Sequence, residues 1–265
     1  MRPEGLAQRF FAAQEIAREA GRLAVGYIDD LNRLNVELKG PQDFVSAADR
    51  AVEHLIIDRL SAMFPGEAFL GEESHAHGDI DDAALWVIDP IDGTANFVRG
   101  LAEWVVSIGL LVAGVPTIGV IYHAASDALY AARRGEGATR NGVAMRVSGR
   151  TTLAGSLVGL ESSFRGGPAA HVGMMRTLFA QGGEYRRYGS AALGLALVAE
   201  GRLDAFAEIH LNAWDVAAGI VLVNEAGGWT NDFFAGNGLR DGGPMFAACA
   251  GVRDAFVQIA DSAGS

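Results

Sequence analysis

The sequence predicts an α/β protein whose N-terminal half is α+β and whose C-terminal half is α/β. Three observations support this prediction: amphipathic helix patterns open the chain, alternating apolar segments follow, and strands and helices alternate after about residue 150. The chain has 265 residues, half of them hydrophobic, which suffices for a substantial core. We therefore expect an α+β domain over residues 1–150, with long N-terminal helices and an antiparallel sheet, and an α/β domain over residues 151–265.

Two helices are predicted at the start of the chain. Apolar residues recur at alternating spacings of four and three from Leu6 to Tyr27, which is typical of one long amphipathic helix. The segment Ser46-Ala47-Ala48-Asp49 fits a capping box with Asp in place of Glu, and it begins a helix that Pro65-Gly66 ends. Capping alone would explain Asp49.

The stretch Trp86–Gly100, WVIDPIDGTANFVRG, joins a predicted buried strand to two carboxylates. Asp89 and Asp92 lie three residues apart at the strand end, and Gly93 permits a tight turn before a short helix that Thr94 can cap. Carboxylates beside the amides of a helix start can hold cations and a phosphate together. An Asx-type turn with a helix cap explains the same residues without any chemistry.

The later elements follow from apolar segments and the turns between them. Strands at 105–112, 117–122 and 128–132 suggest an antiparallel meander, and Asn141-Gly142 indicates a hairpin. Beyond the meander, the predicted strands are 156–160, 184–188, 203–209 and 245–248, and the predicted helices are 168–179, 190–199, 215–225 and 252–259. This alternation implies a parallel or mixed sheet covered on both faces.

Charge and cysteine content exclude several classes of partner. The 21 basic and 32 acidic residues give a formal charge of −11, which disfavours nucleic acid and anionic membranes and repels phosphorylated substrates unless cations mediate the contact. The single cysteine, Cys249, fits a reducing cytoplasm. No signal peptide is visible, and Gly and Pro residues break the apolar stretch Trp104–Tyr122. We expect a soluble cytoplasmic protein without a membrane or nucleic-acid partner.

Further carboxylates extend the candidate site. Glu72 directly follows a short apolar segment, and Asp215 begins a predicted helix, where an N-cap role would also explain it. Together with Asp89 and Asp92 they could form one acidic cluster. Four carboxylates share a site only when cations compensate their charge, and oxygen ligands favour Mg²⁺ or Mn²⁺ over zinc.

Other hydrolase chemistries lack their motifs. The Asp pair is D-x-x-D rather than D-x-D, Cys249 has an Arg four rather than six residues later, and G-x-S-x-G, H-E-x-x-H and Walker A patterns are missing from the sequence. His75 and His77, in a predicted loop, have no third ligand at a zinc spacing. Metal-activated water is the nucleophile that fits.

These motifs resemble the inositol monophosphatase family. The similarity is carried by three segments and extends over nearly the whole chain: Gly71-Glu72-Glu73, Asp89-Pro90-Ile91-Asp92-Gly93-Thr94, and Trp214-Asp215 with the helix that follows. The resemblance implies a layered α-β-α-β-α sandwich of the sugar-phosphatase type. It further implies a Mg²⁺-dependent, lithium-sensitive phosphomonoesterase that forms a homodimer.

The resemblance also implies a role for each motif residue. The ligands of two to three Mg²⁺ ions, with Mn²⁺ a possible substitute, would be Glu72, Asp89, the Ile91 carbonyl, Asp92 and Asp215. The catalytic residues would be Glu72 and Thr94, which orient the attacking water, and Asp49, which polarises Thr94. The phosphate would lie on the amides of Gly93, Thr94 and Ala95. The substrate-binding residues, from the second domain, would be Glu208, Ser190 and Ala191.

The implied substrate is a small phosphorylated metabolite, a polyol or amino-alcohol monophosphate. Inositol monophosphate is the first expectation. Histidinol phosphate is the alternative, since a carboxylate at Glu208 suits its ammonium equally well. A regulatory partner-binding protein with incidental phosphatase activity is a second alternative, against which the intact set of predicted ligands argues.

Overall fold

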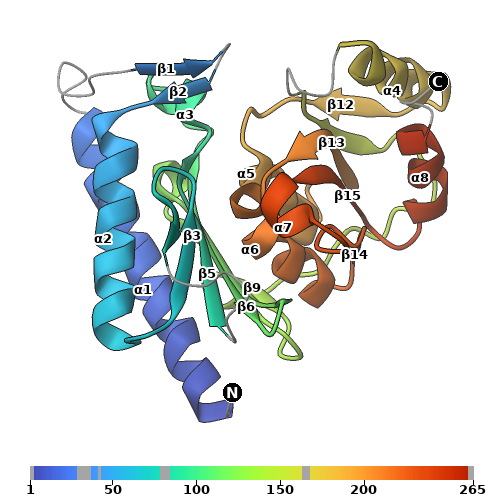
Figure 1. Cartoon of the computed structure of the whole chain (residues 1–265). Helices are drawn as coiled ribbons and strands as arrows, with labels where there is room; N and C mark the ends of the chain where they lie inside the picture. The colour runs from blue at the N-terminus through green and yellow to red at the C-terminus, as the bar shows by residue number, and fades with distance from the viewer. Residues whose placement is uncertain (1–2, 29–36, 41–42, 78–83, 163–167, 262–265) are drawn as a thin grey trace.

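A computed structural model describes residues 3–28, 37–40, 43–77, 84–162 and 168–261. Helices and sheets alternate in layers (Figure 1). The first layer is formed by α1 (Pro3–Ile28) and α2 (Ala47–Met63), which pack on one face of a large sheet. On its other face lie α5 (Ala191–Ala199) and α6 (Ala213–Glu225), which separate it from a smaller sheet. The layered α-β-α-β-α prediction is confirmed.

The large sheet has the strand order β10-β9-β8-β7-β6-β5-β3-β4 within the described residues. All neighbouring pairs are antiparallel except β3 and β5, which run parallel. The strands are β3 (Ala68–Gly71), β4 (His75–His77), β5 (Ala84–Asp92), β6 (Val105–Val112), β7 (Val115–His123), β8 (Ala128–Arg133), β9 (Ala138–Arg140) and β10 (Val143–Ala144). The predicted meander and the Asn141-Gly142 hairpin are confirmed.

The smaller sheet is mixed, as predicted. Its order is β12-β11-β13-β15-β14, with β11 parallel to both of its neighbours. Its strands are β11 (Leu157–Leu160), β12 (Glu184–Arg186), β13 (Ala205–Leu211), β14 (Trp229–Thr230) and β15 (Gly243–Ala248). The outer layer is formed by α4 (Pro168–Ala180) and α8 (Arg253–Asp261).

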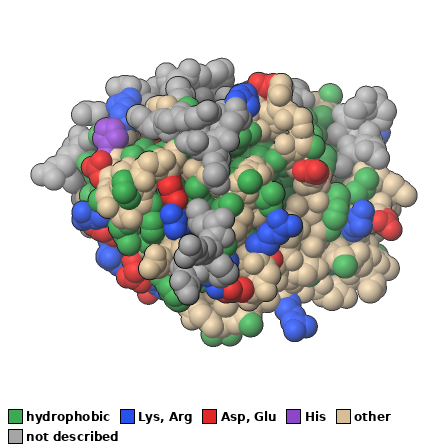
Figure 2. Space-filling model, turned by 60° about the horizontal axis from the view of Figure 1, so that its bottom comes forward, with side chains coloured by type: hydrophobic (Ala, Val, Ile, Leu, Met, Phe, Trp, Pro, Cys, Tyr) green, Lys and Arg blue, Asp and Glu red, His purple; other side chains and the backbone are tan. Residues whose placement is uncertain are grey.

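The remaining elements are short. They are the β1–β2 hairpin (Glu37–Gly40 and Asp43–Val45), α3 (Thr94–Phe97), the 3₁₀ turn Ala124–Ser126 and α7 (Gly238–Asp241). None of the described helices has the length and apolar character needed to cross a bilayer. On the face shown in Figure 2, basic and acidic side chains are interspersed among apolar and polar ones.

The prediction of a loop at His75 and His77 was wrong. These residues bound β4, an edge strand that pairs antiparallel with β3 through Phe69↔His77 and Gly71↔His75. Pairing with an existing strand overrides weak local preference, which a single sequence does not reveal.

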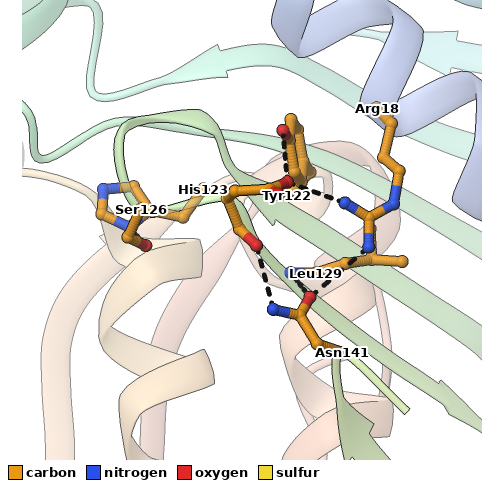
Figure 3. Close-up of polar contacts among 7 residues, drawn as sticks. Arg18, Tyr122, His123, Ser126, Leu129 and Asn141 are labelled. Atoms are coloured by element: carbon orange, nitrogen blue, oxygen red, sulfur yellow. Dashed lines mark hydrogen bonds and ion pairs between the residues drawn. The ribbon is translucent and has the colours of Figure 1, made fainter.

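A polar network ties α1 to the large sheet (Figure 3). Arg18 donates to the Asp127 carboxylate at 2.8 Å and lies 5.4 Å over the ring of Tyr122, whose hydroxyl donates to the same carboxylate at 2.9 Å. Asn141 donates to the Asp127 carbonyl at 3.0 Å and accepts from the Leu129 amide at 2.8 Å. The network fixes the β7–β8 and β9–β10 turns beneath the N-terminal helix.

Close approach of α6 to the large sheet depends on glycine. Gly109 of β6 and Gly119 of β7 are cross-strand partners, and both face α6. A Cβ at Gly109 would come within 2.8 Å of Ala217 Cβ, and one at Gly119 would overlap the Ala218 carbonyl. Since the second half of the chain thus covers the sheet of the first half, the two halves share a core. The boundary at residue 150 stays a prediction.

Candidate active site

Three aspartates gather where β5 meets α6. Each of Asp89, Asp92 and Asp215 offers a carboxylate oxygen, and these oxygens lie within 4.8 Å of one another. Residues three apart on a regular strand point to opposite faces. The register of β5 against β6 shifts between Asp89 and Asp92, so this bulge re-aims one side chain and both carboxylates reach the same site.

Burial and mutual repulsion disfavour the charged forms of the carboxylates in this cluster. Asp89 is 1% exposed, and burial, followed by the charges of Glu72, Asp92 and Asp215, holds its pKa well above the usual range. Burial likewise raises the pKa of Asp92 to about 6, although hydrogen bonds to its carboxylate act in the opposite direction. Hard oxygen donors around uncompensated negative charge are what a divalent cation requires, so the residues present fit such an ion.

Glu72 reaches this cluster from a neighbouring strand end. It follows β3, which runs parallel to β5, and its amide donates to the Ile88 carbonyl at 3.2 Å. The residues Glu72–Ser74 form the tight turn between β3 and β4 rather than an extended segment. Because parallel strands end at the same edge of a sheet, this turn brings Glu72 close enough for its charge to raise the pKa of Asp89, and its role as a metal ligand stays a prediction.

The buried Glu53 on α2 holds the turn that carries Glu72. Its carboxylate accepts hydrogen bonds from the amides of Glu73 at 3.0 Å and Ser74 at 2.8 Å. Gly71 leaves room for it, since a Cβ there would overlap the Glu53 carboxylate. The sequence reasoning missed Glu53. The available signal was its position four residues after Asp49, on the same face of the helix.

Glu53→Gln should loosen the Glu72 turn, because the amide replaces one acceptor oxygen with a donor facing a backbone N–H. We expect activity to fall about tenfold, the effect typical of outer groups that orient metal ligands, together with about 1–2 kcal/mol of stability. Steady-state kinetics and urea unfolding measure both. The matched control is Glu225→Gln: Glu225 also accepts from two amides, those of Gly135 and Gly137 at 2.8 Å, but at the far end of α6. Equal activity losses in the two variants would contradict a role specific to Glu72.

Asp49 caps α2 and also contacts Thr94. Its carboxylate accepts from the amide and hydroxyl of Ser46 at 2.8 and 2.6 Å, which confirms the capping box. The Thr94 hydroxyl lies 3.2 Å from Asp49 Oδ1 and 3.0 Å from the Ile91 carbonyl, and can donate to either. Burial raises the pKa of Asp49. The capping explanation and the predicted contact with Thr94 therefore both hold.

The predicted N-cap positions of Thr94 and Asp215 were wrong. Gly93 precedes α3 with φ +99°, and Thr94 is the first helical residue. At α6, the N-cap is Asn212, and Asp215 lies three residues inside, where it accepts the Asn212 amide at 2.7 Å. Thr94 thus lies in the first turn of α3, while Asp215 completes the capping box of α6 and belongs to the acidic cluster.

The turn at Asp89 and Gly93 is tightly constrained. The Ile91 amide donates to Asp89 Oδ1 at 3.0 Å, so the expected Asx-type turn is present. A Cβ at Gly93 would come within 2.7 Å of the Glu103 carbonyl. Intrahelical hydrogen bonding starts with the Asn96 amide, so the amides of Gly93, Thr94 and Ala95 precede it at the start of α3.

Ser190 and Ala191, expected to line the substrate, hydrogen-bond Asp92. The Ser190 hydroxyl donates to Asp92 Oδ2 at 2.6 Å, the Ala191 amide to Oδ1 at 3.3 Å, and the Ala192 amide to Oδ2 at 2.7 Å. These donors fix the orientation of the Asp92 carboxylate. Their predicted contact with substrate stays a prediction.

Glu208 lies with a second carboxylate that the sequence reasoning missed. Glu208 on β13 is 7% exposed, and burial, then the charges of Glu161, Asp215 and Asp92, holds its pKa well above the usual range. Glu161 follows β11 directly beside β13, and burial raises its pKa to about 7. The signal for Glu161 was a carboxylate immediately after an apolar strand, the same signal that indicated Glu72.

Comparison with known proteins identifies the family. A family model described as "Inositol monophosphatase family" matches residues 6–255. The chain belongs to this family. It is therefore a phosphoric monoester hydrolase of the inositol monophosphatase type, and its acidic cluster is that of a metal-dependent family.

Individual relatives of this inositol monophosphatase family member align with most of its length. It is 40% identical to an inositol-1-monophosphatase of Mesorhizobium japonicum over 92% of each chain, and 38% identical to the Nus factor SuhB of Escherichia coli over 85% of each. Among solved structures, it matches the extragenic suppressor protein suhB of Bartonella henselae with a TM-score of 0.87 and 37% identity, over 95% of this chain and 96% of that one. The inositol monophosphatase of Anabaena gives 0.84 and 33%, over 96% of each.

Proposed function

We propose that this enzyme hydrolyses inositol monophosphate to inositol and phosphate in a reaction that requires divalent cations, with Mg²⁺ as the resident ion and Mn²⁺ as a substitute. The observation that carries the proposal is the convergence of Asp89, Asp92 and Asp215 from two distant segments, with carboxylate oxygens within 4.8 Å. Glu72 and the Ile91 carbonyl would complete the ligand set for two to three ions. Relatives named inositol-1-monophosphatase support this substrate.

The residues around the cluster would bind phosphate and orient the attacking water. The amides of Gly93, Thr94 and Ala95, at the start of α3, would donate to phosphate oxygens. The Thr94 hydroxyl, held by Asp49, and the Glu72 carboxylate would position the water in line with the leaving oxygen. Bound cations would neutralise the phosphoryl oxygens and lower the pKa of the water.

Glu208 supports a hydroxylated leaving group. Its buried carboxylate, near Asp92 and Asp215, can accept hydrogen bonds from the hydroxyls of inositol. A specific observation also favours histidinol phosphate as a second candidate: Glu161 and Glu208 lie close together, and two carboxylates suit an ammonium. A regulatory binding role is the third candidate, because some relatives bear the name Nus factor SuhB. Lithium sensitivity and a homodimer remain part of the proposal through the family resemblance, and a cytoplasmic location through the single cysteine, Cys249.

Phosphate release from two substrates tests the proposal. We expect release from inositol 1-phosphate that requires Mg²⁺ or Mn²⁺, stops with a chelator, and shows a higher kcat/KM than release from histidinol phosphate. A reversed preference would favour the second candidate. Without metal-dependent release from either substrate, the proposed function fails.

The metal-free protein should lose stability as pH rises through the titration of Asp92. The pKa of Asp92 rises from 3.8 to about 6 on folding, so between these values the folded state binds more protons than the unfolded state. The free energy of unfolding therefore falls from about pH 4 to about pH 6, and added Mg²⁺ at pH 7.5 should restore it. Thermal unfolding of the wild type and of Asp92→Asn, both with chelator, measures this contribution as the difference between their free energies of unfolding. If this difference in free energy did not vary with pH, the predicted contribution of Asp92 would be contradicted.

A further inference from the structure

Glu161 lies at the end of β11 on the side that faces the site. It is 2% exposed, and its amide donates to the Ala207 carbonyl at 3.0 Å, which continues the parallel pairing of β11 with β13. Val158 and Leu160 pack in the core beneath α4 and α8. Because strand side chains alternate, Glu161 projects to the opposite face of the sheet, toward α5.

The Glu161 carboxylate binds the segment that orients Asp92. It accepts hydrogen bonds from the amides of Tyr188 at 2.5 Å and Gly189 at 3.0 Å. The next residue, Ser190, is the N-cap of α5 and donates to Asp92, as do the two amides that follow it. One run of five residues, 188–192, therefore donates first to Glu161 and then to Asp92.

The same segment packs on the turn expected to bind phosphate. The Tyr188 carbonyl accepts from the Asn96 side-chain amide at 2.7 Å, and Asn96 also donates to the Glu103 carbonyl at 2.6 Å. A Cβ at Gly93 would come within 3.3 Å of the Gly189 carbonyl. A shift of residues 188–192 would thus disturb the start of α3 as well as Asp92.

We propose that Glu161 is a positioning residue for the metal site: by binding the amides of Tyr188 and Gly189, it fixes the donors that hold the Asp92 carboxylate in place. This inference rests on the proposed role of Asp92 as a metal ligand. Arg187, 3.8 Å from Glu161 and more than half exposed, lies on the solvent side of this contact. Groups that orient metal ligands typically change metal affinity 10–100-fold when removed.

Calorimetric titration of the metal-free full-length chain with Mn²⁺ tests the proposal. Glu161→Gln keeps the side-chain volume but turns one acceptor into a donor that faces a backbone N–H, so we expect Mn²⁺ to bind at least about tenfold more weakly. Glu225→Gln is the matched control. It loses one of two equivalent amide contacts about 15 Å along α6 from Asp215, and should bind Mn²⁺ within about twofold of the wild type. Wild-type affinity in Glu161→Gln, or equal weakening in Glu225→Gln, would overturn the proposal.

Two further variants keep the test decisive. Glu161→Asp retains both acceptor oxygens on a shorter side chain, should show an intermediate affinity, and serves if Glu161→Gln does not fold. Ser190→Ala removes one donor to Asp92, and its effect on Mn²⁺ affinity should be less than additive with Glu161→Gln, because both act through one segment. If the effects of the two substitutions on Mn²⁺ affinity were fully additive, Glu161 and Ser190 would not act through one segment.

Asp92→Asn separates the two proposals. If this variant binds Mn²⁺ like the wild type, the proposed metal assignment fails. If Asp92→Asn weakens binding and Glu161→Gln does not, only the role of Glu161 fails.

Discussion

Asp92→Asn is expected to lower kcat at least about 100-fold in the presence of Mg²⁺, the upper end of the loss known for groups that only orient metal ligands, while the fold survives. The change removes one charge and one ligand oxygen from a cluster whose other members lie within 4.8 Å. The fold should survive because Ser190 and Ala192 both donate to the same oxygen, Oδ2, which the Asn carbonyl oxygen can replace. Removal of one charge also relieves repulsion in the metal-free state.

Initial rates of phosphate release and far-UV circular dichroism measure the two parts of this prediction. Asp254→Asn is the control, since Asp254 on α8 has a side chain that is 97% exposed. It should leave kcat unchanged. Near-wild-type turnover in Asp92→Asn would show that the aspartate cluster is not the metal site.

Gly119→Ala is expected to destabilise the protein by about 3 kcal/mol, at the upper end of the usual cost of overpacking a core. The new methyl group would overlap the Ala218 carbonyl of α6, and backbone cannot move aside as a flexible side chain can. The helix would have to shift away from the sheet. Since α6 carries Asp215, metal-dependent activity should fall together with stability.

Urea unfolding measures the loss. The control is Gly26→Ala in α1, an exposed helical glycine whose added Cβ would meet no atom within 4 Å. It should stabilise the protein by up to about 1 kcal/mol through helix propensity. A Gly119→Ala variant as stable as the wild type would show that α6 does not lie this close to β7.

Local patterns predicted most elements of this fold. The helices α1 and α2 could be predicted from the alanine-rich stripe of the first and the capping box of the second, because periodicity and caps depend only on residues close together in the sequence. Pairing between segments is different. The edge strand β4 forms by pairing with β3 across the turn 72–74, and the bulge in β5 arises in its pairing with β6; neither was predicted from the sequence.

The candidate site divides in the same way. Carboxylates at strand ends and helix starts could be recognised one motif at a time, and Asp89, Asp92 and Asp215 do come together. Glu53 and Glu161 were not predicted, because their positions in the sequence do not reveal that each accepts hydrogen bonds from backbone amides of another segment. The family resemblance placed Ser190 beside substrate, whereas its hydrogen bond to Asp92 joins residues that lie 98 positions apart in the chain.

The acidic cluster draws its members from two layers: β5, which carries Asp89 and Asp92, belongs to the large sheet, whereas α6, which carries Asp215, comes from the second half of the chain and lies between the two sheets. An ion bound there would therefore bridge the two halves of the chain at their junction. Its departure would leave like charges pushing the halves apart. An ion at this site would thus add to the core contacts that hold the two halves together, and a change that separates β5 from α6 would weaken ion binding.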